Sequence, residues 1–89
     1  MNPAALPDKP RLNRLFRLQW EPAQDAHVLL YPEGMVKLNA SAAAILQSCD
    51  GERDVAQIVE HLEQRFDTTG LAADVTGWLA TATERGWVV

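Results

Sequence analysis

The first clear pattern along the chain is an alternation of apolar and polar residues over positions 16–20. Phe16, Leu18 and Trp20 are apolar, and a polar residue separates each from the next. This period of two is typical of a β-strand with one buried face. Pro22 ends the pattern, because proline has no backbone N–H and favours a turn. We therefore expect a strand over these residues.

The next two apolar segments indicate a β-hairpin. Residues 27–31 (HVLLY) form a short apolar run, and residues 35–38 form the returning strand. Between them, Pro32 occupies the second position of a turn and Gly34 the fourth, which suits a type I turn whose glycine is left-handed. Residues 12–38 as a whole are predicted to form a three-stranded antiparallel sheet.

From Asn39 onward the apolar period becomes helical. Asn39 or Ser41 can cap a first short helix, and Gly51 suits its C-terminal end. The inner side of this helix carries Ile45, Leu46 and Cys49. A second helix is predicted after Asp54, because Asp54 and Gln57 have the spacing of a capping box. Its apolar stripe comprises Val55, Ile58, Val59, Leu62 and Phe66.

A third helix is predicted after a short polar segment. Its candidate N-caps are Asp67, Thr68 and Thr69, and Gly86 suits its C-terminal end. The helix repeats the apolar spacing at Leu71, Val75, Trp78, Leu79 and Ala82. Residues 87–89 (WVV) are expected to return to the sheet or the core. Three strands followed by three helices predict an α+β domain with the helices packed on one face of the sheet.

Length and composition fit a single small domain. A chain of 89 residues with 47% hydrophobic residues is sufficient for one modest core. Residues 1–10 contain three of the five prolines, so we expect a flexible N-terminal arm, followed by one domain over residues 11–89. The single cysteine excludes an internal disulfide, and no apolar stretch approaches the roughly 18–20 residues of a membrane span. Without a secretory signal pattern, the expected location is the cytoplasm.

The sequence offers little that could support catalysis. An enzyme needs a nucleophile with a base, a metal site or a cofactor loop. The two histidines, His27 and His61, lie on a predicted strand and in a predicted helix, and no Cys or His pair has metal-ligand spacing. No glycine-rich phosphate loop occurs, and Cys49 is better explained as a small core residue than as a nucleophile. We therefore expect a non-enzymatic protein with no cofactor and no metal.

A small sheet with three helices is also the shape of a DNA-binding winged helix. Such a protein presents a basic helix to the groove of DNA. This chain has a net charge of −4 and an isoelectric point near 4.9. The predicted second and third helices expose charges of both signs, at Glu60, Glu63, Arg65, Asp74, Glu84 and Arg85. Nucleic-acid binding is therefore the weaker interpretation.

An interaction module is the remaining class, and two features favour it. The strand over residues 35–38 follows a hairpin and can lie at the sheet edge, where unpaired backbone groups accept an added strand. Trp78 lies beside the small residues Gly77 and Ala82, which allows a shallow groove, although an ordinary core role for Trp78 remains the alternative. A free edge also permits strand-exchanged dimers at high concentration, whereas a monomer is expected otherwise.

Several spaced elements of the sequence resemble one known family. Residues 27–51 (HVLLYPEGMVKLNASAAAILQSCDG) contain an LLYPEG hairpin, then VKLN, and then a helix that ends in CDG. The upstream segment 20–24 (WEPAQ) and the downstream pair Asp74-Val75 also match. Over residues 10–89 the chain resembles the PqqD family, coenzyme PQQ synthesis protein D.

This resemblance implies a winged-helix-like fold that does not bind DNA and serves as a recognition element for ribosomally made, modified peptides. It implies binding of the precursor peptide PqqA and a ternary complex with PqqE. PqqE is a radical S-adenosylmethionine enzyme that cross-links Glu and Tyr of that peptide on the route to pyrroloquinoline quinone (PQQ). The alternative is a relative that serves another modified-peptide pathway.

The resemblance also implies where the peptide binds. In related recognition elements, the leader peptide adds as a strand to the third β-strand and packs on the third helix. The strand side of that site would here be Met35, Val36, Lys37 and Leu38. The helix side would be Val75, Trp78, Leu79 and Ala82.

Overall fold

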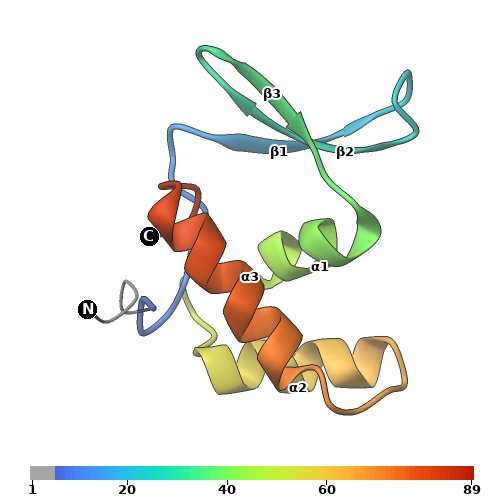
Figure 1. The fold of residues 1–89 in the computed structure, drawn as a ribbon, viewed down its shortest axis with the longest axis vertical. Helices are drawn as coiled ribbons and strands as arrows, with labels where there is room; N and C mark the ends of the chain where they lie inside the picture. Colours follow the sequence, from blue (N-terminus) through green and yellow to red (C-terminus); the bar gives the residue numbers. More distant parts are fainter. Residues whose placement is uncertain (1–5) are drawn as a thin grey trace.

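The first elements of the chain form the predicted antiparallel sheet. The computed structural model describes residues 6–89, and Figure 1 shows its elements. Strands β1 (Arg17–Glu21), β2 (Ala26–Tyr31) and β3 (Gly34–Lys37) pair antiparallel in the order β1-β2-β3. The prediction of a three-stranded meander is confirmed, although the strands fill only part of the predicted span 12–38.

The hairpin between β2 and β3 differs from its prediction at Gly34. Tyr31 pairs with Gly34, so Pro32 and Glu33 alone form the loop. Gly34 has a φ of 157°, which is a mirror-image extended backbone and not the predicted left-handed helical one. The reason is that Gly34 is already the first residue of β3 and must be extended to pair with Tyr31.

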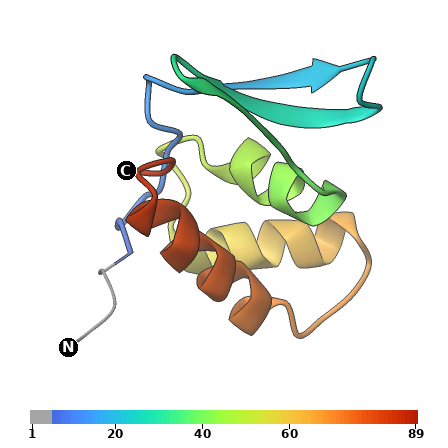
Figure 2. The same cartoon turned by 45° about the horizontal axis from the view of Figure 1, so that its top comes forward.

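The three helices lie together on one side of the sheet, as Figure 2 shows. They are α1 (Ala40–Ser48), α2 (Val55–Arg65) and α3 (Ala72–Glu84). Of the two predicted caps for the first helix, Asn39 is the one used, because its side-chain oxygen accepts a hydrogen bond from the Ala42 amide at 2.8 Å. The α+β architecture of a three-stranded sheet followed by three helices is confirmed.

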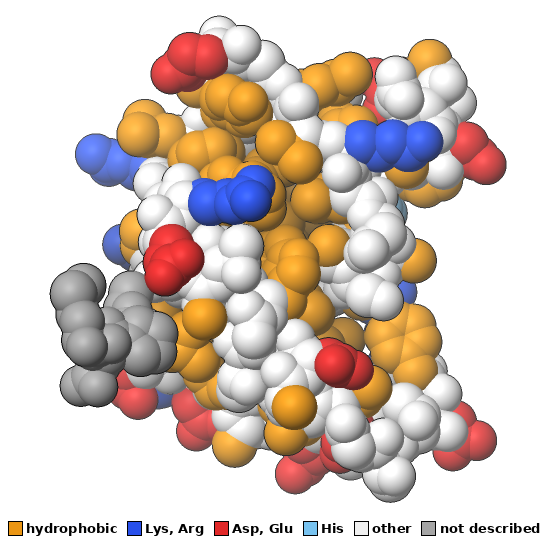
Figure 3. Space-filling view, viewed as in Figure 1, with side chains coloured by type: hydrophobic (Ala, Val, Ile, Leu, Met, Phe, Trp, Pro, Cys, Tyr) orange, Lys and Arg blue, Asp and Glu red, His pale blue; other side chains and the backbone are white. Residues whose placement is uncertain are grey.

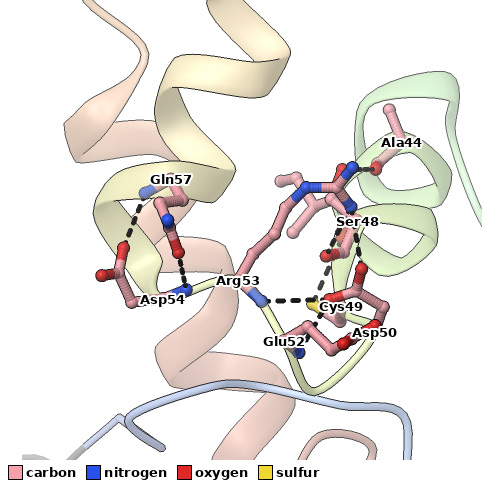
Figure 4. Close-up of polar contacts among 9 residues, drawn as sticks. Ala44, Ser48, Cys49, Asp50, Glu52, Arg53, Asp54 and Gln57 are labelled. Carbon is pink, nitrogen blue, oxygen red and sulfur yellow. Dashed lines mark hydrogen bonds and ion pairs between the residues drawn. The ribbon is translucent and has the colours of Figure 1, made fainter.

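Local hydrogen bonds fix the turn between α1 and α2 (Figure 4). Asp50 accepts hydrogen bonds from the backbone amides of Glu52 and Arg53, and its carboxylate lies 3.2 Å from the Arg53 guanidinium. The predicted capping box is present: the Asp54 side chain accepts from the Gln57 amide at 2.8 Å, and the Gln57 side chain accepts from the Asp54 amide at 2.9 Å. The start of α2 is therefore well defined relative to the end of α1.

The start of α3 is held by a residue that the sequence did not suggest. Its N-cap is Leu71, which provides no side-chain cap. The Glu63 carboxylate of α2 instead accepts a hydrogen bond from the Leu71 amide at 3.0 Å. The predicted caps Asp67, Thr68 and Thr69 lie in the turn after α2, where Asp67 has a left-handed φ of 49°. That prediction was wrong because a carboxylate eight positions earlier takes the place of a local cap.

The core lies between the sheet and the helices. Leu29 of β2, Ile58 of α2 and Leu79 of α3 have no exposed surface. Trp20 departs from the predicted pattern, because 50% of its surface is exposed although Phe16 and Leu18 pack against the core. Trp20 lies near the end of β1, where its ring meets His27 edge to face and borders a hollow.

The C-terminal residues 87–89 return to the core beside the N-terminal segment, and not to the three-stranded sheet. Arg11 and Val89 exchange backbone hydrogen bonds of 3.0 and 2.9 Å. Leu12 forms an isolated bridge with Val88, whose exposed fraction is 1%. The last residues of the chain therefore close the core next to α3.

The predicted flexible arm over residues 1–10 falls partly outside the described residues, since the structure describes the chain from residue 6. Within the described part, Leu6 packs against the core and the Pro10 side chain is fully buried. The Pro10 carbonyl also accepts a hydrogen bond from the Gly51 amide at 3.0 Å. The packed domain therefore begins before residue 11.

Candidate functional site

Within residues 6–89, strand β3 is a free edge of the sheet, because only its β2 side is paired. The Leu38 amide donates a hydrogen bond to the His27 carbonyl of β2 at 3.0 Å. In antiparallel pairs, residues alternate between those that bond the neighbouring strand and those that do not. The N–H and C=O groups of Met35 and Lys37 therefore point away from β2. These groups are oriented to pair with an added strand.

The side chains of the predicted strand site differ in accessibility. Met35 is 48% exposed and Lys37 is exposed, whereas Val36 is partly buried against the core and Leu38 is only 6% exposed. Val36 pairs with Leu29, which is part of the core. An added strand would therefore find a backbone edge that is anchored by buried side chains.

The predicted helix side of the site is mostly core in this structure. Val75, Leu79 and Ala82 are 2%, 0% and 0% exposed. Trp78 is only partly buried, and its ring centroid lies 6.1 Å from that of Trp87. An added Cβ at Gly77 would meet no atom within 4 Å, so this glycine faces open space. Trp78 is thus the one predicted α3 contact that retains accessible surface.

Helix α1 lies between the two predicted halves of the site. Figures 1 and 2 both show β3 and α3 toward the same side of the molecule, with α1 between them. No Cα atom of β3 lies within 8 Å of a Cα atom of α3, whereas α1 packs against both β2 and α3. Figure 3 shows a strip of hydrophobic side chains down the middle of this face. We call this apolar strip between β3 and α3 the groove.

A hollow of about 240 Å³ opens among the three helices, and we call it the helical hollow. It is lined by Ala40, Ser41, Ala44, Ile45, Leu62, Phe66, Thr68, Leu71, Asp74 and Val75. The hollow is smaller than the roughly 300–1,000 Å³ of small-molecule sites, which suits one side chain of a peptide. The sequence pattern does not distinguish this hollow, because most of these residues fit an ordinary core stripe. One available signal was Phe66, a large apolar residue at the very end of its helix that is 49% exposed.

Cys49 does not have the properties of a nucleophile. Its side chain is 6% exposed, and its Sγ donates to the Ile45 carbonyl at 3.2 Å. Burial, with a smaller contribution from the negative charge of Asp50, raises the pKa of the thiol to about 12. The thiol therefore stays protonated at neutral pH, and the core interpretation of this residue is the better one.

Within residues 6–89, no cluster of three or more His, Cys, Asp and Glu side chains is placed to hold a metal ion. Over the same described residues, no helix has the length and apolar character needed to cross a membrane. The features that the site does offer are a backbone edge, a half-buried tryptophan and an apolar hollow. Features of this kind can bind an extended peptide.

Residues 26–88 match the family described as Coenzyme PQQ synthesis protein D (PqqD). A protein of Azotobacter vinelandii named PqqA binding protein is 56% identical over 89 residues, which cover 99% of this chain and 97% of that protein. The solution NMR structure of the PqqD truncation of Methylobacterium extorquens PqqCD is described as a functional and stand-alone recognition element for ribosomally synthesised, modified peptides. It matches with a TM-score of 0.79 at 33% identity, over 100% of this chain and 99% of that one. The crystal structure of PqqD from Xanthomonas campestris has a TM-score of 0.57 at 30% identity, over 98% of this chain and 96% of that one. The resemblance found in the sequence is confirmed, and the chain belongs to the PqqD family.

Proposed function

We propose that this chain binds the precursor peptide PqqA in PQQ biosynthesis and presents it to PqqE, and that it performs no chemistry itself. The observation that carries the proposal is the free edge of β3, where Met35 and Lys37 turn unpaired backbone groups toward solvent beside an apolar groove. The name of the similar Azotobacter protein, PqqA binding protein, supports PqqA as the ligand.

The proposed binding mode is strand addition. Backbone hydrogen bonds to β3 accept many sequences and set the alignment of the peptide, whereas side-chain pockets supply selectivity. Successive side chains of a strand point to opposite faces, so every second side chain of the peptide faces the domain. Trp78 is available to one of them, and the helical hollow is available to another.

Presentation follows from holding the peptide near PqqE. A peptide tethered by a short flexible link reaches an effective concentration on the order of millimolar at its target. The domain thereby raises the rate of encounter without any catalytic group of its own. A recognition role in another modified-peptide pathway is the second candidate, because backbone pairing alone does not distinguish one peptide from another.

A matched pair of variants at Lys37 tests strand addition. Lys37→Pro removes an outward N–H from the edge and places a ring where the peptide strand would lie, without removing a bond to β2. Lys37→Ala removes the same side chain but keeps the N–H. We expect Lys37→Pro to weaken PqqA binding about tenfold or more, since one lost hydrogen bond costs about 0.5–1.5 kcal/mol and the ring adds a steric cost. Lys37→Ala should stay within about threefold of the wild type.

The measurement is a titration of isotope-labelled protein with PqqA, followed by amide chemical shifts for each variant. Shifts should cluster on β3 and on the exposed side of α3. Clustering on α2 (Val55–Arg65) would contradict the proposed site. If the wild type does not bind PqqA but binds the precursor of another pathway, the PQQ assignment fails while strand addition survives.

A further inference from the structure

A second hollow opens against another face of α1. It shares Lys37 and Leu38 with the proposed peptide edge, and Ala40, Ala44 and Phe66 with the helical hollow. It has a volume of about 560 Å³ and lies between the β1–β2 end of the sheet and the C-terminal end of α2, toward the right of Figure 1. We call it the Trp20 hollow. The side chains that matter in it are Trp20, His27, Gln47, Arg65 and Phe66. No residue of α3 lines it, so it is distinct from the Trp78 side of the groove.

Two half-exposed aromatic side chains face this hollow. Trp20 is 50% exposed and meets His27 edge to face, with ring centroids 5.2 Å apart. Phe66 is 49% exposed, and the Arg65 guanidinium lies 5.4 Å from the centre of its ring. Large aromatic side chains left half exposed around one concavity are typical of a protein-binding surface. Tryptophan and arginine are also the residue types that most often dominate binding energy at interfaces.

Hydrogen bonds connect three polar side chains that line the hollow. Arg65 Nη1 donates to Gln47 Oε1 at 3.1 Å. Because arginine only donates, the Gln47 oxygen must face Arg65, and its amide nitrogen therefore faces His27 Nε2 at 3.2 Å. His27 must then accept through Nε2. Three elements, β2, α1 and α2, are thus linked by side chains that line the hollow.

Arg65 is positioned to receive a carboxylate from outside. Arg65 is exposed, and within residues 6–89 the one ion pair joins Arg53 and Asp50, so no carboxylate of the described chain pairs with Arg65. The chain as a whole has a net charge of −4, whereas this hollow combines Arg65 and Lys37 with a single acidic residue, Asp25. The local charge therefore favours an acidic group, to which an arginine can bind through two parallel hydrogen bonds.

We propose that the Trp20 hollow is the docking site for the enzyme that modifies the bound peptide, and that the enzyme inserts a segment with an apolar side chain next to a carboxylate. The apolar side chain packs between Trp20 and Phe66, and the carboxylate pairs with Arg65. This inference rests on the proposed function, because it supplies the enzyme contact that presentation requires. Lys37 and Leu38 line the hollow and also belong to the peptide-binding edge, so an enzyme docked here lies beside the bound peptide.

The test compares three variants of the full chain in binding to purified PqqE and, separately, to PqqA. Trp20→Ala and Arg65→Gln remove the two proposed anchors. Arg85→Gln is the matched control, because Arg85 also stacks on an aromatic ring, 5.2 Å from the centre of Trp87, but lies at the end of α3. Phe66 is left unchanged, because it lines both hollows.

We expect Arg65→Gln and Trp20→Ala each to weaken PqqE binding about tenfold or more, since hydrogen bonds to charged groups and central aromatic contacts have that magnitude. PqqA binding should change less than about threefold, and Arg85→Gln should leave PqqE binding as in the wild type. Circular dichroism and thermal unfolding establish that each variant is folded.

Three outcomes overturn the proposal. Folded Arg65→Gln and Trp20→Ala proteins that bind PqqE like the wild type show that the enzyme docks elsewhere. Variants that lose PqqA binding but keep PqqE binding show that the hollow belongs to the peptide. A wild-type protein that binds PqqA but not PqqE removes the presentation step itself, which is a failure of the proposed function and not of this surface alone.

Discussion

Trp78 and Leu79 are neighbours in α3, and the structure predicts opposite consequences for replacing them. Leu79 has no exposed surface and lies in the core, whereas Trp78 is partly buried beside Trp87. Leu79→Ala should therefore act on stability, because it leaves a cavity among packed side chains. Trp78→Ala should act on peptide binding, because it removes the one large aromatic surface that α3 offers to the groove.

The expected magnitudes are well separated. Replacing a buried leucine by alanine costs about 2–5 kcal/mol, and a domain of 89 residues is stable by only about 4–13 kcal/mol in total. Leu79→Ala should therefore lower the melting temperature by about 10–25 °C. The affinity of its folded molecules for PqqA should change less than about twofold. Trp78→Ala should weaken PqqA binding about thirtyfold, which corresponds to the roughly 2 kcal/mol of a central aromatic contact.

Urea unfolding measures the first effect, and a PqqA titration well below the melting temperature measures the second. Gly77→Ala is the control on the same helix, because an added Cβ meets nothing within 4 Å and alanine favours helix by up to about 1 kcal/mol. This control should be slightly more stable and should bind PqqA normally. Loss of PqqA affinity in folded Leu79→Ala, together with unchanged affinity in Trp78→Ala, would contradict these two roles.

Four further predictions concern other parts of the chain. Asp54→Ala should cost about 1 kcal/mol in urea unfolding, because it removes the cap of α2, and an unchanged midpoint would show that the capping box adds nothing. Cys49 should resist iodoacetamide at pH 7.5 until the protein unfolds, because its pKa is raised to about 12; rapid labelling of the native protein would contradict this. Hydrogen bonds from the amides of Glu52 and Arg53 lower the pKa of Asp50 in the folded protein below its unfolded-state pKa of about 4. The stabilisation that Asp50 provides is therefore present above the unfolded-state pKa and is lost as the pH falls through the folded-state pKa. Asp50→Asn should have a lower free energy of unfolding than the wild type at pH 6, and this difference should narrow toward pH 3. A difference that stays constant with pH would contradict this role of Asp50. Light scattering at millimolar concentration should detect strand-exchanged dimers that PqqA dissociates, because the dimer and the peptide both use the β3 edge. A dimer fraction that PqqA leaves unchanged would show that the dimer does not use this edge.

Elements whose signals are local could be predicted from the sequence. The capping box of Asp54 and Gln57 and the cap at Asn39 lie within three residues of the helix starts they define, and both are present. The start of α3 was missed because its cap, Glu63, comes from another helix. A pattern of neighbouring residues contains no information about a carboxylate that only the packed fold brings close.

The site was predictable at the level of the backbone and less so at the level of side chains. A meander places its third strand at an edge, so the position of β3 followed from the order of the strands. The helical period placed Val75, Trp78, Leu79 and Ala82 on one stripe, but it could not show that the core covers all of them except Trp78. The Trp20 hollow was missed for the same reason: a period of two assigns a face to Trp20 without showing how far the helices beneath that face extend.

The connection between β3 and α1 determines how the proposed peptide and enzyme sites relate. β3 ends at Lys37, Leu38 is buried, and Asn39 already caps α1, so the edge continues directly into α1. A peptide strand paired with β3 must therefore leave the domain at this point, because the edge ends there. The same two residues, Lys37 and Leu38, line the Trp20 hollow. In the proposed complex, an enzyme docked in that hollow would thus meet the peptide at the end of its paired segment, where its chain is free to enter an active site.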